Sequence, residues 1–321
     1  MKQAAALLLT GVLVFGSTAL GQTSVEFTVT PEVEWNFGTT KYTMDQDDVG
    51  SELEFPLDLT LAGGRFGVSW FKEGHPEWTL SGQAMFGVND PGGVFTDKDW
   101  INTQSGARYG FSSTESHVEM NMTRLEIEAT RLLAHGETAE LALLVGFGYQ
   151  KISLDAVDLK GSQAVVDGDS VYIVWFDIDT LALKYEIEYF VPQIGLVPRL
   201  RPHPDWLLEL MAAFSPLVRV QDLDTHLLRY FTVEAEGNGF GVCSRLGLWY
   251  KSPGSPASRK PRIFAGLTGD FSYFKADLSA TIEFYADNPD EGYDEGEILP
   301  DLPHDIRSAQ FAVGVQAGIA F

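Results

Sequence analysis

Basic residues and cysteine are scarce in this sequence, and each shortage bears on the class of protein. The 321 residues include 22 Lys and Arg against 45 Asp and Glu, for a formal net charge of -23. A nucleic-acid partner is not expected, because phosphate binding requires clustered basic side chains. The single cysteine, Cys243, cannot form an internal disulfide and reads as a small packed residue. A surface this acidic instead attracts cationic molecules.

Long hydrophobic runs are also missing beyond the N-terminus. Met1 and Lys2 precede a mostly apolar stretch from Ala4 to Phe15, and small residues follow up to Gly21. This order is typical of a secretory signal peptide, so we expect residues 1–21 to be one. No later stretch approaches the roughly eighteen uninterrupted apolar residues of a membrane-spanning helix.

The mature sequence does contain period-two alternation of apolar and polar residues. The C-terminal stretch is the clearest case, with apolar residues at every second position from Ala309 to Phe321. One apolar face along each strand suits a transmembrane β-barrel, with lipid outside and a polar interior. A soluble sandwich also alternates, but its strands are usually shorter. Such runs predict about ten strands, at residues 24–38, 51–71, 78–89, 117–133, 139–155, 172–200, 206–221, 229–251, 262–285 and 307–321.

The connections between these expected strands alternate in length. Those after the second, fourth, sixth and eighth strands are short (72–77, 134–138, 202–205 and 252–261), and most of the others are longer and polar. Short periplasmic turns and long external loops are typical of bacterial barrels. We therefore predict an all-β fold, a ten-stranded antiparallel transmembrane β-barrel over residues 22–321, located in the cell outer membrane with long extracellular loops.

Two pairs of residues fall in expected external connections and carry possible chemistry. Asp224 and His226 share one face of an extended segment, and a carboxylate beside an imidazole can make the histidine a general base. Asp97 and Asp99 have the same spacing. Each pair alone is a weak signal, since such aspartates also occur in solvated turns or loose calcium sites and most surface histidines have no catalytic role. Their shared position on one rim favours a site where a water lies between His226 and the two aspartates.

These residues resemble a known family, the omptins, which are ten-stranded outer-membrane endopeptidases. Asp97-Lys98-Asp99-Trp100 is similar to the family's D-x-D-W segment, and Asp224-Thr225-His226 is similar to its D-x-H dyad. Residues 145–150 and 191–196 add further similarity, and the resemblance spans most of the mature chain at low identity.

The resemblance implies a mechanism and a substrate class. Asp224 would orient His226, which would take a proton from a water held against Asp97 and Asp99, without a covalent intermediate. Family members cleave between basic residues, and acidic pocket residues would pair with them. Asp222 matches one such residue; the second would come from the first external loop, where Asp45 is a candidate beside Asp47 and Asp48.

One part of the resemblance is incomplete. Omptins bind lipopolysaccharide through a cluster on the barrel wall, and Tyr149 matches one member of that cluster. Lys151, Ser153 and Glu188 stand where the family pattern has Glu, Arg and Arg. The resemblance therefore leaves open a different activating lipid, or none.

The sequence thus predicts an outer-membrane aspartic-type endopeptidase acting on cationic peptides at basic sites, as a monomer, with no metal or cofactor other than a possible outer-membrane lipid activator. A non-catalytic barrel of the same ancestry, acting as a surface adhesin or structural protein, is the main alternative. A small pore is the third, and it fits less well because ten strands enclose a lumen that side chains can fill.

Overall fold

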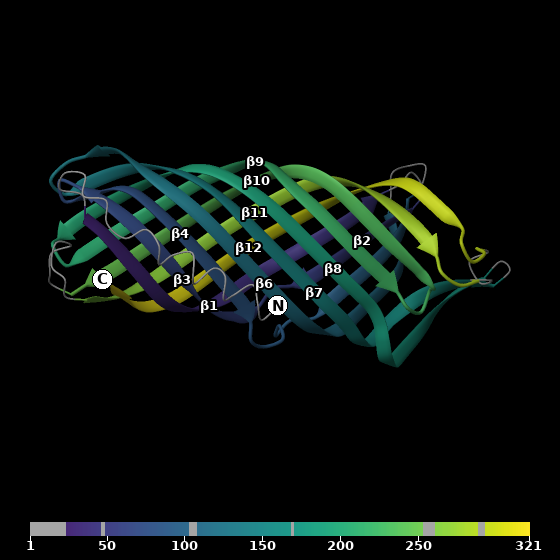
Figure 1. Cartoon of the computed structure of the whole chain (residues 1–321). Coiled ribbons are helices and arrows are strands. Elements are labelled where there is room, and N and C mark those ends of the chain that lie inside the picture. Colours follow the sequence, from purple (N-terminus) through teal and green to yellow (C-terminus); the bar gives the residue numbers. More distant parts are fainter. Residues whose placement is uncertain (1–23, 46–48, 103–107, 168–169, 253–260, 288–292) are drawn as a thin grey trace.

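The computed structural model describes residues 24–45, 49–102, 108–167, 170–252, 261–287 and 293–321, and almost all of them lie in antiparallel strands (Figure 1). The strands are β1 (Ser24–Asp45), β2 (Val49–Pro56), β3 (Leu59–Lys72), β4 (His75–Gly87), β5 (Phe95–Asn102), β6 (Arg108–His135), β7 (Ala139–Asp167), β8 (Ser170–His203), β9 (Trp206–His226), β10 (Phe231–Lys251), β11 (Arg262–Phe284) and β12 (Ile298–Ala320).

The strands close into a barrel. Each strand from β6 to β11 pairs with the next, β6 also pairs with β4, β4 with β3 and β3 with β1, and β12 pairs back with β1. Ten strands form this ring. The predicted all-β, ten-stranded antiparallel barrel is therefore confirmed.

The remaining two strands, β2 and β5, complete the ring at one end only. β2 pairs with the last part of β1, from Thr39 to Asp45, and β5 pairs with both β2 and the start of β6. At this end, the mouth of the barrel, β2 and β5 lie between β1 and β6. In the rest of the barrel, which we call the lower ring, β3 and β4 lie between β1 and β6.

The mouth differs from the sequence-based expectation. We expected one strand over 51–71 and a connection around residue 97, whereas the structure has two strands, β2 and β3, in the first region and a further strand, β5, in the second. The chain breaks between β2 and β3 at Leu57 and Asp58, yet Leu57 is fully buried and its N–H bonds the Gly38 carbonyl at 2.9 Å. The alternation of apolar and polar residues therefore continues through this break, and the sequence pattern does not indicate that the strand is divided there.

The two faces of the strands are sharply different. Along β12, the side chains of Phe311, Val313 and Val315 are exposed, whereas those of Gln310 before them and Gln316 after them are buried in the interior. Along β9 the outward residues are apolar from Trp206 to Leu217, and Arg219 is the first outward charge beyond them. This apolar belt is what the outside of a transmembrane barrel requires. The described part of the chain has no helix long and apolar enough to cross a membrane.

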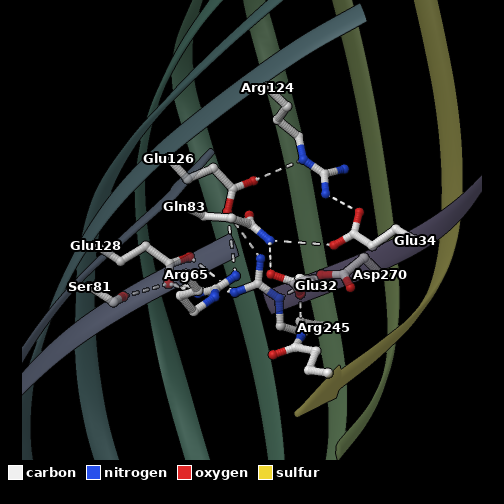
Figure 2. A network of polar contacts seen from close by, with 11 residues as sticks. Glu32, Glu34, Arg65, Ser81, Gln83, Arg124, Glu126, Glu128, Arg245 and Asp270 are labelled. Carbon is white, nitrogen blue, oxygen red and sulfur yellow. Dashed lines mark hydrogen bonds and ion pairs between the residues drawn. The ribbon is translucent and has the colours of Figure 1, made fainter. Parts of the chain in front are cut away.

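The barrel interior at the level of the belt is filled by ion pairs (Figure 2). Arg245 is central: its guanidinium contacts Asp270 at 2.6 Å, Glu126 at 3.1 Å and Glu128 at 3.3 Å. Arg65 also pairs with Glu128, at 3.2 Å, and Arg124 pairs with Glu34. The cavity around Arg245 holds only about 60 Å³. The lumen at this level is thus occupied by paired side chains.

An apolar layer separates these charges from one end of the barrel. Along the inner face of β6, Arg124 is followed toward the start of the strand by Met122, Met120 and Val118, all buried, and then by Ser116 and Thr114. Along β9, buried Val218 and Val220 occupy the same layer, followed by Asp222. The polar residues above this layer are those from which the site is built.

The two ends of the barrel differ as the sequence predicts. The β3–β4, β7–β6 and β8–β9 turns are short and lie at the end that holds the C-terminus, at the left in Figure 1. The long β7–β8 hairpin projects from the opposite end. The predicted signal peptide, residues 1–21, lies outside the described residues.

Candidate active site

The end of β9 brings three polar side chains to the inside of the barrel. Asp222, Asp224 and His226 alternate with outward residues, and β9 is held between β8 and β10, where His226 is opposite Leu183 and Phe231. Both aspartates are buried. The sequence places this segment in a loop; in the structure, pairing with two long neighbours extends the strand as far as His226.

Asp224 and His226 contact each other directly. Asp224 Oδ2 lies 2.8 Å from His226 Nε2, and the imidazole packs against the Phe231 ring with centroids 4.3 Å apart. The Tyr285 hydroxyl donates a hydrogen bond to the His226 carbonyl at 3.2 Å. The ring is fixed on one face and at one nitrogen, which leaves the other nitrogen for a reaction partner.

The second aspartate pair lies on a strand rather than in a loop. Asp97 and Asp99 are on β5, opposite Leu53 and Ser51 of β2. They share a face with Phe95, whose side chain is buried in the apolar layer and packs against Phe55 in a tilted arrangement, with ring centroids 5.2 Å apart. The packed aromatic at the start of β5 fixes which face of the strand points into the barrel, and with it the direction of both carboxylates.

The fold brings these two pairs together. Two adjoining cavities, of about 590 and about 370 Å³, open at this end of the barrel. Asp97, Asp99, His226, Phe111 and Arg229 line both of them. The aspartate pair and the histidine therefore form the boundary between two cavities, where a peptide bond could be reached from either side.

The environment of Asp97 shifts the pKa of its carboxyl group toward neutrality. Burial and the negative charge of Asp99 raise the pKa of Asp97 to about 7, although His226 and Arg229 oppose the rise. Asp97 and His226 line the same two cavities. An acid with a pKa near neutrality can change protonation state during a reaction at physiological pH.

Asp222 lies below the dyad in a different environment. Its Oδ2 accepts a hydrogen bond from the Tyr185 hydroxyl at 2.9 Å, and burial raises the pKa of Asp222 to about 8. Burial raises the pKa of Tyr42 well above its usual value, and the negative charges of Asp222 and Asp224 add to the rise. Asp222 is not among the described residues that line the two cavities, whereas Tyr42 lines the smaller one.

Asp45, the other candidate for a substrate pocket, is exposed at the end of β1 opposite Gly50. It does not occur among the described residues lining either cavity. Asp47 and Asp48 lie outside the described residues.

The predicted lipid-binding position is on the barrel wall. Tyr149 packs against Phe190 with ring centroids 5.4 Å apart, and Lys151 beside it pairs with Glu186 at 2.7 Å and Glu188 at 3.3 Å. The one base in this group is thus matched by two acids, so the wall here offers no net positive charge to an anionic lipid.

Sequence reasoning missed Arg229 and Phe111. Arg229 lies three residues after His226, and its guanidinium carbon is 5.1 Å from the centre of the Phe231 ring. A base so close to the D-x-H segment in an acidic sequence was the available signal. Among the described residues, no group of three or more His, Cys, Asp or Glu side chains is arranged to hold a metal ion.

Comparisons with known proteins agree with this architecture. The model of the Omptin family matches residues 52–244, more than half of the chain. The crystal structure of the outer membrane protease OmpT from Escherichia coli superposes with a TM-score of 0.69 at 13% identity, covering 92% of this chain and 97% of that one. The translocator domain of the autotransporter NalP from Neisseria meningitidis, at 12% identity, covers 98% of this chain and 94% of its own with a TM-score of only 0.34. No curated protein matched the sequence. The family match covers both aspartate pairs and His226, and the chain belongs to the omptin family.

Proposed function

We propose that this protein is an outer-membrane endopeptidase that hydrolyses peptide bonds with a water activated by His226. The observation that carries the proposal is the meeting of Asp97, Asp99 and His226 at the boundary of two cavities, although they come from distant parts of the chain. The E. coli protein with the same fold is described as an outer membrane protease, which supports the assignment.

Each group has a role in the proposed reaction. The water lies between Asp97, Asp99 and the free nitrogen of His226, which takes its proton as the oxygen attacks the scissile carbonyl carbon. Asp224 stabilises the imidazolium through the 2.8 Å hydrogen bond. The imidazolium then gives the proton to the leaving amine, and the carbon–nitrogen bond breaks with no covalent intermediate.

The negative charge on the tetrahedral intermediate needs a counter-charge. Arg229 is the one Lys or Arg among the described residues that line the cavities. Its guanidinium is placed to stabilise the developing oxyanion, and a preorganised cation in such a position lowers the barrier.

Orientation and substrate attraction follow from the whole barrel. The site is at the end opposite the short turns and the C-terminus, which in our proposal is the extracellular end. The net charge of -23 favours cationic peptides as substrates, by concentrating them near the mouth.

Cleavage between basic residues, which the resemblance implies, stays a prediction. A carboxylate that pairs with a substrate Arg must be charged and within reach. Asp222 is buried with a pKa of about 8 and lines neither cavity, so a basic side chain in the smaller cavity does not meet it directly. The activating lipid and the monomeric state also remain expectations.

The direct test is hydrolysis of quenched fluorescent cationic peptides by the refolded barrel, with and without outer-membrane lipid. His226→Ala and Asp97→Ala should abolish cleavage. His117→Ala should not, because His117 is an exposed residue of β6 that lines neither cavity. Heat-modifiable gel mobility confirms folding of each variant. A folded wild-type protein that cleaves no peptide under any lipid condition would instead favour the non-catalytic adhesin or structural barrel.

A further inference from the structure

The smaller cavity beside His226 is lined largely by apolar and aromatic residues. It holds about 370 Å³, which lies within the usual range of pockets that bury a ligand group. Its aromatic members come from five strands and one connection, and they are Tyr42, Trp100, Phe111, Phe231, Phe284 and Tyr293. Aliphatic side chains such as Ile101 and Leu299 complete the lining.

The aromatic wall is built rather than accidental. The imidazole of His226 packs on Phe231, Phe231 meets Phe284 edge-on at 5.6 Å, and Phe284 stacks on Tyr293 at 4.2 Å. The rings therefore run continuously from the reacting imidazole to the far side of the cavity. Each ring is held by its neighbours, so the cavity keeps its shape without a ligand.

Of the charged side chains that line this cavity, Asp97, Asp99 and Arg229 also line the larger cavity, and Asp224 is hydrogen-bonded to His226. Among its described lining residues, the only acids are Asp97, Asp99 and Asp224, which our mechanism already uses, and the only Lys or Arg is Arg229. Asp222 does not line the cavity. A substrate guanidinium entering here would exchange water for aromatic rings, with no further carboxylate to compensate its lost hydration.

We propose that this cavity is the subsite for one residue next to the cleaved bond, and that it selects a large apolar side chain there. The inference rests on the proposed protease function and departs from the cleavage between two basic residues that the resemblance implies. Cationic character is then recognised over the whole peptide by long-range attraction, while the residue at the bond is chosen by burial in the aromatic cavity.

The test is a panel of cationic peptides that differ only at the two positions flanking the bond, each occupied in turn by Phe, Leu, Ala or Arg. At one of the two positions, Phe and Leu should exceed Arg by about tenfold or more in kcat/KM, since even one methylene in an apolar subsite discriminates by that amount. Equal or faster cleavage with Arg at both positions would overturn the inference and leave the protease function standing.

Two variants should reverse the preference by adding a carboxylate to the cavity. Tyr42→Glu places it on the buried floor, and Ile101→Asp places it on the exposed rim, where folding is not at risk. Each should raise cleavage with Arg at the same position and lower it with Phe. Ile173→Asp is the matched control: Ile173 is exposed on β8 and lines neither cavity. A reversal by the control, or none by either cavity variant, would contradict the assignment.

Binding separates this inference from the chemistry. Peptides of the same panel with a reduced, uncleavable bond can be titrated into the protein by fluorescence anisotropy. Tighter binding of the Phe peptide than of the Arg peptide, lost in Ile101→Asp, supports the subsite even if no peptide is cleaved. Absence of that difference would overturn the subsite whatever the activity.

Discussion

At the scale of single residues, Asp97 sets an expectation for the dependence of activity on pH. Its pKa of about 7 means that the carboxylate is largely protonated below neutrality. The proposed reaction needs the charged form to hold the water. We predict that kcat/KM falls about tenfold per pH unit below pH 7 and is level above it. Asp97→Asn should leave a low residual activity without this step, and a wild-type profile that is flat from pH 5 to 8 would contradict the role.

Asp222 gives a prediction for stability at the same scale. Its pKa rises from about 3.8 to about 8 on folding, so the folded protein binds more protons than the unfolded chain between these values. The free energy of unfolding must then decrease as the pH rises through this window. Asp222→Asn should remove that loss, because the amide can still accept the Tyr185 hydrogen bond.

The variant should therefore unfold at the same temperature as the wild type at pH 4 and at a higher temperature at pH 8.5. The gain should be on the order of 2 kcal/mol, within the limit of about 1.4 kcal/mol per pKa unit. Thermal unfolding in detergent, followed by gel mobility, measures it. A constant difference at all pH values would assign the effect to packing instead of titration.

At the scale of elements, β5 is the strand on which the site depends most and the one that the sequence did not predict. Val49–Pro56 of β2 and the start of β6 hold it in place by pairing. Gly50 lies opposite Trp100, and a Cβ at Gly50 would be 2.4 Å from the Trp100 ring. Any larger residue at position 50 must move Trp100, and with it the neighbouring Asp99.

We predict that Gly50→Val lowers kcat/KM by about 100-fold, since displacements of about 1 Å in a catalytic group have such effects. The thermal stability of the barrel should change little, because the lower ring does not include β2 or β5. Gly92→Val, in the connection before β5, is the control, since a Cβ at Gly92 has no atom within 4 Å. Similar losses in both variants would show that the β2–β5 pairing is not what positions the aspartates.

The predictability of these elements follows from what forms them. Strands of the lower ring alternate between apolar and polar residues because lipid and lumen lie on opposite sides of each strand, so these strands can be predicted from the sequence. β5 contains Asp97, Lys98 and Asp99 in succession and has no lipid-facing side, and its strand conformation comes from pairing with β2 and β6. The spacing of each aspartate pair predicted a shared face, but only the closed barrel determines that the two faces meet. The aromatic cavity could not be predicted, because its members come from strands spread over the whole chain.

At the scale of the whole molecule, the charged lumen makes the barrel sensitive to the loss of a single buried partner. Arg245 is buried and contacts three acids, so removing its charge leaves Glu126, Glu128 and Asp270 facing one another with fewer partners. We predict that Arg245→Met destabilises the barrel by about 3–5 kcal/mol, as is usual when one member of a buried ion pair is lost.

The matched control is Arg219→Met, which breaks an exposed pair with Glu236 at 3.0 Å and should cost at most about 1 kcal/mol. Urea titration of both variants in detergent, followed by tryptophan fluorescence, compares them. Equal midpoints for the two variants would mean that the lumen pairs do not stabilise the barrel.

The replacement of β3 and β4 by β2 and β5 at the mouth has a consequence for how such proteins diverge. The lower ring must satisfy a lipid bilayer, and changes there are limited by insertion and folding. Strand β5 carries Asp97, Asp99, Trp100 and Ile101, and it pairs only with β2 and the start of β6. It therefore lies beyond the apolar belt and contributes no residue to it. Selection can therefore change the substrate specificity of the mouth without changing how the barrel inserts into the membrane. The same membrane-embedded ring can support different specificities in the course of evolution.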